Sequence, residues 1–331
     1  MKKTALTGIK PTGKLTLGNY IGVLRNLKQF QEENDCYIFI ADIHALTLPI
    51  DPVELRNNSK DIAAFYLASG LDTAKCHIFL QSMVSEHSEL DTIMVNYLYM
   101  GELSRMTQFK EISKNLNNNA IGLGVFTYPV LMACDILLYN ADIVPVGEDQ
   151  VQHVEITREL VHRFNNRYGD ILKEPNAVVG TTGKRIMSLS DPTHKMSKSD
   201  PKGDIFLKDD EKTIRKKIMS ATTDSGDTIV YDKDNKPGIS NLLMIYASLK
   251  DITIADAEET FKDLHQYGPF KKAVADAVVE ELIPFQARYR SILASSLVDD
   301  ALNKGAAEAK AIAQVTLQKV RKAVGLYETT K

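Results

Sequence analysis

The chain has 331 residues, enough for one large domain and a smaller one, and its 44% apolar and 25% charged composition is typical of a soluble globular protein. The formal net charge of −3 argues against a broad basic surface, so any nucleic acid must be bound by a local patch. No stretch reaches the ~18 apolar residues of a membrane helix, and no secretory signal is visible, which predicts a cytoplasmic protein.

Cys36, Cys76 and Cys134 lie far apart in apolar runs, and we expect buried, reduced thiols rather than metal ligands.

The first part of the chain alternates predicted strands and helices. One predicted strand is a continuous apolar run, which is typical of a strand buried on both faces of a parallel sheet. The predicted strands are 4–8, 36–41 and 77–81, the predicted helices are 17–33 and 53–70, and a turn at 10–13 follows the first strand. This order predicts a Rossmann-like, doubly wound α/β domain over residues 1–205, with ligands beyond the carboxyl ends of the strands.

From about residue 205 onward the pattern becomes helical. The segment 271–295 has helical periodicity, and small or aliphatic residues recur at spacings of three and four in the last segment. The recurring residues are Ala306, Ala309, Ala313, Leu317, Val320 and Val324. We therefore expect a smaller helical domain over 206–331, with a last helix that can fold back on the first domain.

The most specific motif is the pentapeptide 195–199, Lys-Met-Ser-Lys-Ser. Lys195 and Lys198 are three residues apart among small hydroxylated residues, which suits a mobile clamp for the phosphates that leave a nucleotide. A lysine-rich surface loop would explain the same letters without a function. The pentapeptide is also similar to the second signature of the class I aminoacyl-tRNA synthetases.

Further segments extend this resemblance over most of the chain. They are 8–13 with 16–20, 106–110, 127–150, and 190–193 leading into the pentapeptide. Their order and spacing closely resemble those of the bacterial tryptophanyl-tRNA synthetases. The resemblance implies activation of L-tryptophan with ATP as substrate, followed by transfer of tryptophan to tRNA(Trp). It implies Mg²⁺ bound through the phosphates, with no metal held by the protein. It also implies a homodimer, with no membrane or DNA partner. The helical domain would bind the tRNA anticodon.

The first signature of this class, usually His-Ile-Gly-His, corresponds here to residues 16–19. Thr16 and Asn19 replace the histidines and can still donate hydrogen bonds to a phosphate, while Gly18 lets the backbone approach the nucleotide. Capping of a helix by Thr16 would explain the same position structurally, and both roles are compatible at a helix start. The resemblance makes Thr16, Asn19, Lys195 and Lys198 catalytic and assigns ATP to Lys10, Thr12, Gly18, Asn19, Gly147, Asp149, Ile186, Lys195, Met196, Ser197 and Lys198.

Asp135 is an acid inside an apolar segment, on the same predicted helix face as Tyr128 and Met132. A buried carboxylate needs a partner, and an arginine or a backbone N–H would supply a purely structural one. The resemblance instead assigns Asp135 to the indole N–H of the substrate, which would exclude analogues that lack this donor. The implied tryptophan set is Leu6, Lys10, His44, Tyr128, Met132, Asp135, Val144, Val146 and Gln150, with Tyr128 and Gln150 on the ammonium group.

Three positions depart from the family pattern. Lys10 stands where glutamine is common, and Leu6 replaces an aromatic residue at the pocket floor. The second active-site lysine position falls on Ile112, or on Lys114 if two residues are inserted. Three alternatives stay open: a tyrosyl-tRNA synthetase, a nucleotidylyltransferase of the same superfamily, and a non-catalytic paralogue that senses tryptophan or tRNA.

Overall fold

Five parallel strands form one sheet in the order β3-β2-β1-β4-β5. The computed structural model describes residues 2–114, 121–179, 185–196 and 200–327, so Ser197 and Lys198 lie outside the described residues. The strands are β1 (Lys3–Ile9), β2 (Asn34–Ile40), β3 (Cys76–Leu80), β4 (Ile143–Val146) and β5 (Asn176–Val179). The strand order reverses between β1 and β4, and in such sheets ligands bind beyond the carboxyl ends at this point. The predicted α/β fold is confirmed.

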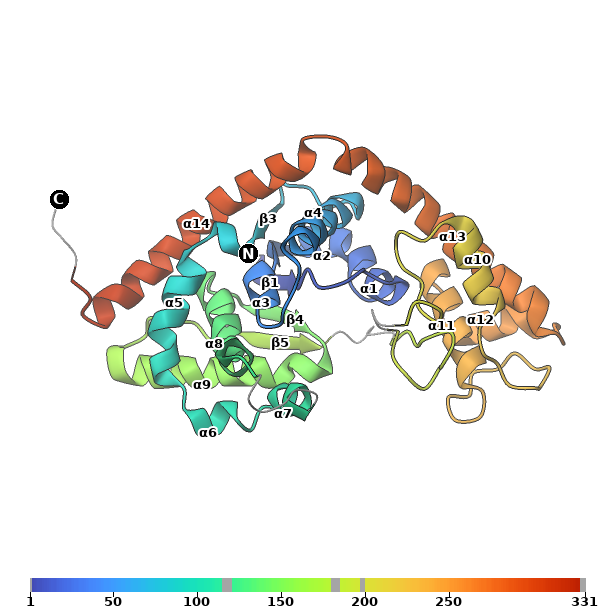
Figure 1. Cartoon of the computed structure of the whole chain (residues 1–331), viewed down its shortest axis with the longest axis horizontal. Coiled ribbons are helices and arrows are strands. Elements are labelled where there is room, and N and C mark those ends of the chain that lie inside the picture. Colours follow the sequence, from blue (N-terminus) through green and yellow to red (C-terminus); the bar gives the residue numbers. More distant parts are fainter. Residues whose placement is uncertain (1, 115–120, 180–184, 197–199, 328–331) are drawn as a thin grey trace.

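Helices cover both faces of the sheet and build the rest of the molecule (Figure 1). In the first part they are α1 (Leu17–Gly22), α2 (Leu27–Glu33), α3 (Asp42–Ala45), α4 (Pro52–Ala68), α5 (Glu86–Met94), α6 (Met100–Leu103), α7 (Thr107–Lys114), α8 (Leu123–Leu138) and α9 (Val151–Tyr168). The second part contains α10 (Glu211–Met219), α11 (Pro237–Lys250), α12 (Ile254–Phe261), α13 (Tyr267–Leu293) and α14 (Leu297–Ala323). Short 3₁₀ turns are η1 (Leu24–Asn26), η2 (Gln81–Met83), η3 (Val95–Tyr97) and η5 (Glu148–Gln150).

The predicted single helix over 17–33 is wrong, because the chain breaks there into α1, η1 and α2. The break lies at Val23, whose φ of −128° and ψ of −65° fall outside the helical region, directly after Gly22. Glycine and a β-branched residue both have low helix propensity, so the interruption occurs where the helix is weakest. The predicted strands and the helix over 53–70 are confirmed to within two residues at each end.

Alternating side chains of the strands feed two apolar clusters, one on each face of the sheet. Ala5, Ile38 and Ile78 belong to the cluster that continues into the helical part through residues such as Phe285 of α13. Leu6 and its neighbours belong to the other cluster, which also contains the buried face of α8 and α14. The helical part is therefore joined to the α/β part by continuous apolar packing.

Helix α14 lies against β3 and α5, so the end of the chain returns to the α/β part (Figure 1). The contact is close at Gly305, where an added Cβ atom would lie 2.0 Å from the carbonyl oxygen of Ile78 in β3. Only glycine lets the two backbones approach in this way. His77 of the same strand adds a polar contact, with its Nδ1 2.8 Å from Glu308 Oε2 of α14.

We expect Gly305→Ala to lower the free energy of unfolding by about 3 kcal/mol, because the methyl group must push α14 away from β3. Gly268→Ala is the matched control, since nothing lies within 4 Å of its added Cβ in α13. That control should be neutral or stabilising by about 0.5–1 kcal/mol. Urea unfolding of the two variants and the parent checks the prediction, and equal stability of the two variants would contradict it.

Candidate active site

Residues from three parts of the sequence meet beyond the carboxyl ends of β1, β2 and β4. Lys10 follows β1 directly, His44 lies in α3 after β2, and the segment 147–150 follows β4. Parallel strands end at a common edge, so residues about 140 positions apart in the sequence lie at one edge of the sheet. Lys10, His44 and Gln150, predicted for tryptophan, and Gly147 and Asp149, predicted for ATP, therefore follow strands at this edge.

The two segments that resemble the class I signatures meet at Gly18. An added Cβ there would lie 3.7 Å from Ile186 Cβ and 3.8 Å from Met196 Cβ. The backbone N–H of Met196 donates to the Ile186 carbonyl oxygen at 2.9 Å, which closes the chain into a turn that carries exposed Lys195 and buried Met196. Gly18, Ile186 and Met196, all predicted for ATP, are therefore brought together.

Thr16 and Asn19 form a capping box at the start of α1. The Asn19 backbone N–H donates to Thr16 Oγ1 at 3.4 Å, and the Thr16 backbone N–H donates to Asn19 Oδ1 at 2.9 Å. Thr16 is buried, and its hydroxyl donates to Asn19 Oδ1. The structural role considered for Thr16 is thus present, and it fixes the backbone at the start of α1.

Asp135 of α8 is 1% exposed and accepts hydrogen bonds at both carboxylate oxygens. His44 Nε2 lies 2.8 Å from Oδ2, while His87 Nδ1 and Gln81 Nε2 lie 2.6 Å and 2.7 Å from Oδ1. Its partners are thus two histidines and a glutamine, rather than the arginine or backbone N–H considered from the sequence. His44 comes from α3, His87 from α5 and Gln81 from η2.

These partners keep the Asp135 carboxylate ionised. Burial by itself would raise the pKa of Asp135, but attraction to His44 and hydrogen bonds from His44 and His87 hold it below its ordinary value. For nearby Asp91, burial and then repulsion from Asp135 raise the pKa to about 6. The site therefore holds one carboxylate charged and acceptor-only at neutral pH.

A second polar group surrounds the Tyr128 hydroxyl. This hydroxyl donates to Gln108 Oε1 at 2.6 Å and lies 2.7 Å from His153 Nε2. Lys10 Nζ lies 5.0 Å from the Tyr128 ring centroid, a cation–π distance, and partial loss of hydration lowers the pKa of Lys10. Lys10, Tyr128 and His44 are brought together, since the His44 and Tyr128 rings meet edge to face with centroids 6.3 Å apart.

The loop after β4 is organised by Asp149. Its Oδ2 accepts from Gln150 Nε2 at 3.0 Å and from Gln108 Nε2 at 3.3 Å. A Cβ at Gly147 would lie 2.6 Å from Asp149 Oδ1, so the glycine leaves room for this carboxylate. Tyr128 and Gln150 are both predicted for the substrate ammonium. Each is bonded to other protein groups, and they are linked to one another through Gln108 and Asp149.

The predicted apolar walls lie on one side of the sheet. Leu6 and Val144 are buried in the cluster that includes the α8 core, and Met132 and Val146 are partly buried against it.

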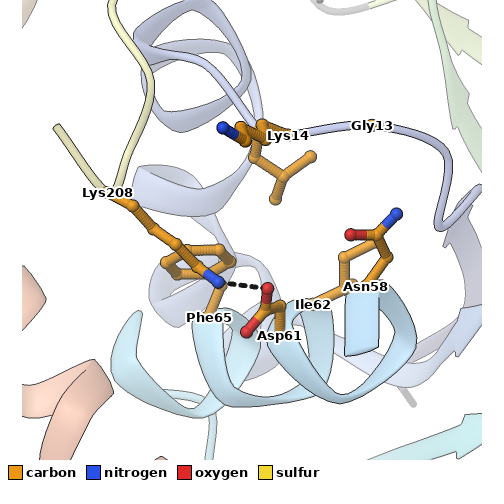
Figure 2. Close-up of a pocket in the computed structure, with 8 residues that line it drawn as sticks. Gly13, Lys14, Asn58, Asp61, Ile62, Phe65 and Lys208 are labelled. Carbon is orange, nitrogen blue, oxygen red and sulfur yellow. Dashed lines mark hydrogen bonds and ion pairs between the residues drawn. The ribbon is translucent and has the colours of Figure 1, made fainter. Parts of the chain in front are cut away.

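The small pocket in Figure 2 is a different feature, lined by Gly13, Lys14, Leu15, Asn58, Asp61, Ile62, Phe65 and Lys208. Its volume of about 20 Å³ suits about one water molecule, and an ion pair between Lys208 and Asp61 crosses it. It contains none of the residues predicted for ATP or tryptophan.

Sequence reasoning missed four side chains: Gln81, His87, Gln108 and His153. Gln108 lies in a segment that carried the family resemblance, and His153 follows Gln150 by three residues. Gln81 and His87 gave no signal, because an isolated glutamine and histidine near a helix start are ordinary in sequence. Only the fold places them on Asp135.

Burial, followed by the charge of Lys10, lowers the pKa of His153 to about 4, which predicts an acid-sensitive contribution to stability. The unfolded imidazole takes up a proton near pH 6.5, but the folded one does so only near pH 4, so stability falls as pH drops through this window. Between pH 7.5 and 5, we expect the free energy of unfolding of the parent to fall by about 2 kcal/mol more than that of His153→Gln. Urea unfolding at both pH values measures this loss, with exposed His162→Gln of α9 as control. An equal loss in the parent and His153→Gln would contradict the prediction.

Comparisons with known proteins agree with this geometry. Residues 2–282 match the family model of the class I tRNA synthetases for tryptophan and tyrosine. The chain is 48% identical to the tryptophan–tRNA ligase of Halalkalibacterium halodurans, over 98% of both chains. The chain belongs to the tryptophanyl-tRNA synthetase family. It is an aminoacyl-tRNA synthetase, as the pentapeptide and the segments around it predicted.

Solved structures of this family have the same fold. The tryptophanyl-tRNA synthetase of Mycoplasma pneumoniae superposes with a TM-score of 0.90 at 39% identity, covering 99% of both chains. That of Campylobacter jejuni, solved with ADP and tryptophan, gives a TM-score of 0.83 at 34% identity, covering 98% of this chain and 100% of that one. These relatives favour tryptophan over the tyrosine alternative that the sequence left open.

Some family-derived assignments remain predictions. The side chains of Ile112 and Lys114 lie outside the described part of the structure, as do Ser197 and Lys198.

Among the described residues, no helix is long and apolar enough to cross a membrane. Within the same residues, no group of three His, Cys, Asp or Glu side chains could hold a metal ion.

Proposed function

We propose that this chain activates L-tryptophan with ATP to form tryptophanyl-adenylate and pyrophosphate, and then transfers tryptophan to tRNA(Trp). The observation that carries the proposal is the ionised Asp135, buried in the apolar helix α8 of a fold shared with tryptophanyl-tRNA synthetases. An acceptor-only carboxylate in such a place suits a ring that is apolar except for one N–H group.

For the amino acid, Asp135 would accept the indole N–H, with Met132, Val144 and Val146 against the ring. Lys10 lies over the Tyr128 ring at the same edge of the sheet, so its ammonium is placed to attract the substrate carboxylate. That group attacks the α-phosphorus of ATP in line, and correct positioning of the two reactants supplies much of the rate enhancement.

For ATP, the close packing of Gly18 against Ile186 and Met196 supports a nucleotide site between the two signatures. Lys195 and Lys198 would neutralise the charge that builds on the leaving pyrophosphate, and Asp149 would bind the ribose hydroxyls. A Mg²⁺ ion would be held at this site through the phosphate oxygens of ATP, as is usual for this cation at nucleotide sites. When bound, it would shield the phosphate charge.

The remaining assignments concern partners and place in the cell. We infer that residues 206–331 form the part that binds the tRNA anticodon, and that the enzyme acts in the cytoplasm, where tRNA is charged. A homodimer is supported by exposed apolar residues in the segment from η3 to the first residue of α6, namely Val95, Tyr99 and Met100. Their exposed fractions of 37%, 61% and 76% are high for large side chains.

Amino-acid-dependent exchange of pyrophosphate into ATP tests the first step, with tryptophan and tyrosine assayed in parallel. We expect exchange with tryptophan only. Exchange with tyrosine would overturn the role of Asp135, and tryptophan binding without exchange would favour the non-catalytic paralogue. Charging of tRNA(Trp) transcripts then tests the second step.

A further inference from the structure

His87 of α5 is a buried histidine that the family-derived assignments leave without a role. It is fully buried, and both ring nitrogens are used: Nδ1 lies 2.6 Å from Asp135 Oδ1, and Nε2 lies 2.7 Å from the Tyr139 hydroxyl. Asp135 is ionised and can only accept, so Nδ1 must carry a proton and donate to Oδ1, while Nε2 pairs with the Tyr139 hydroxyl. Both nitrogens of the ring are thus fixed by a partner on each side.

Aromatic packing holds the His87 ring in place. Its centroid lies 6.1 Å from those of Phe39 and Phe79 and 5.5 Å from that of Tyr139. The two phenylalanines come from adjacent strands β2 and β3, so the ring rests on the rigid centre of the sheet. A histidine held in this way fixes the position of the carboxylate that it contacts.

The distribution of hydrogen bonds over the Asp135 carboxylate is uneven. Oδ1 accepts from both His87 and Gln81, whereas His44 is the one partner of Oδ2 among the residues that the structure describes. A carboxylate oxygen has two lone pairs, so Oδ1 is filled and Oδ2 keeps one free. An incoming N–H group therefore finds its acceptor at Oδ2.

We propose that His87, anchored by Tyr139, is a positioning residue for tryptophan recognition, which occupies Asp135 Oδ1 so that Oδ2 faces the indole N–H. This inference rests on the proposed role of Asp135 as acceptor of the indole N–H. His87 does not touch the substrate and acts through the carboxylate alone.

The test compares kcat/KM for tryptophan with kcat/KM for β-(3-benzothienyl)-L-alanine, which has sulfur in place of the ring N–H, in pyrophosphate exchange. His87→Phe keeps an aromatic ring but removes the donor, and we expect it to lower the tryptophan preference by about tenfold. The KM for ATP should stay unchanged. His87→Asn places an amide donor near the lost Nδ1 and should recover most of the preference.

Two further variants make the result specific. His77→Phe is the matched control, because His77 Nδ1 also lies close to a carboxylate, that of Glu308 at 2.8 Å, while its ring packs on Tyr37 rather than on His87. It should leave the preference unchanged. If His87→Phe fails to fold, Tyr139→Phe removes only the anchoring hydroxyl and should lower the preference by a few-fold.

Asp135→Asn separates failure of this inference from failure of the proposed function. If Asp135→Asn removes the preference while His87→Phe and Tyr139→Phe keep it, the positioning role of His87 is overturned and the role of Asp135 stands. If Asp135→Asn also keeps the preference, Asp135 is not the indole acceptor and both are overturned.

Discussion

Replacing Lys195 or Lys198 with alanine is expected to slow tryptophanyl-adenylate formation by about 100- to 1,000-fold, the range seen when one preorganised charge-stabilising group is lost. The negative charge that these ammonium groups would meet develops on the pyrophosphate as it leaves, so it is greatest in the transition state. An interaction made mainly there lowers kcat and leaves the affinity for tryptophan almost unchanged.

Single-turnover adenylate formation and equilibrium binding of tryptophan measure the two quantities separately. Lys202→Ala is the control, because Lys202 is an exposed lysine a few residues after the motif but outside it. Equal losses in the rate and in tryptophan affinity would show that the lysines act in ground-state binding. An unchanged rate would leave the pentapeptide as a surface loop.

Much of the fold was predictable because burial leaves a local pattern in the sequence. The run 36–41 is apolar at every position, as a strand covered on both faces must be, and it falls within two residues of β2. The helix break at Val23 was missed because the apolar spacing of residues 21, 24, 27 and 30 continues across it. Periodicity records which side chains are buried, and it does not record a local change in φ and ψ.

The site was less predictable, because its geometry depends on residues distant in sequence. The unusual setting of Asp135 in an apolar helix indicated a buried carboxylate that needs a partner. Its actual partners, His44, Gln81 and His87, precede it by 48 to 91 positions, and only the strand order brings them to it. No local pattern marks such contacts, so family resemblance was needed to place His44, and Gln81 and His87 were missed.

Asp135→Asn is expected to lower the preference for tryptophan over β-(3-benzothienyl)-L-alanine by about 100-fold or more, the largest effect on specificity that we predict. The amide has the same shape but carries two N–H donors, and the present partners of Asp135 also donate. One of those partners, or the indole N–H, must then face a donor and lose its hydrogen bond. The benzothienyl analogue brings no N–H and avoids this loss, so kcat/KM should fall mainly for tryptophan.

The loss of the charged acceptor should also reduce stability, since a buried ionised carboxylate held by two histidines and a glutamine is replaced by a neutral amide. We expect the free energy of unfolding to drop by about 3 kcal/mol. Asp142→Asn is the control, because the Asp142 carboxylate is likewise a hydrogen-bond acceptor, for the backbone N–H of Thr4 at 2.9 Å, but it precedes β4 at the opposite edge of the sheet. It should leave the preference unchanged. A variant Asp135→Asn that is destabilised yet keeps the parent's preference would make Asp135 a purely structural residue, and the indole N–H would need another acceptor.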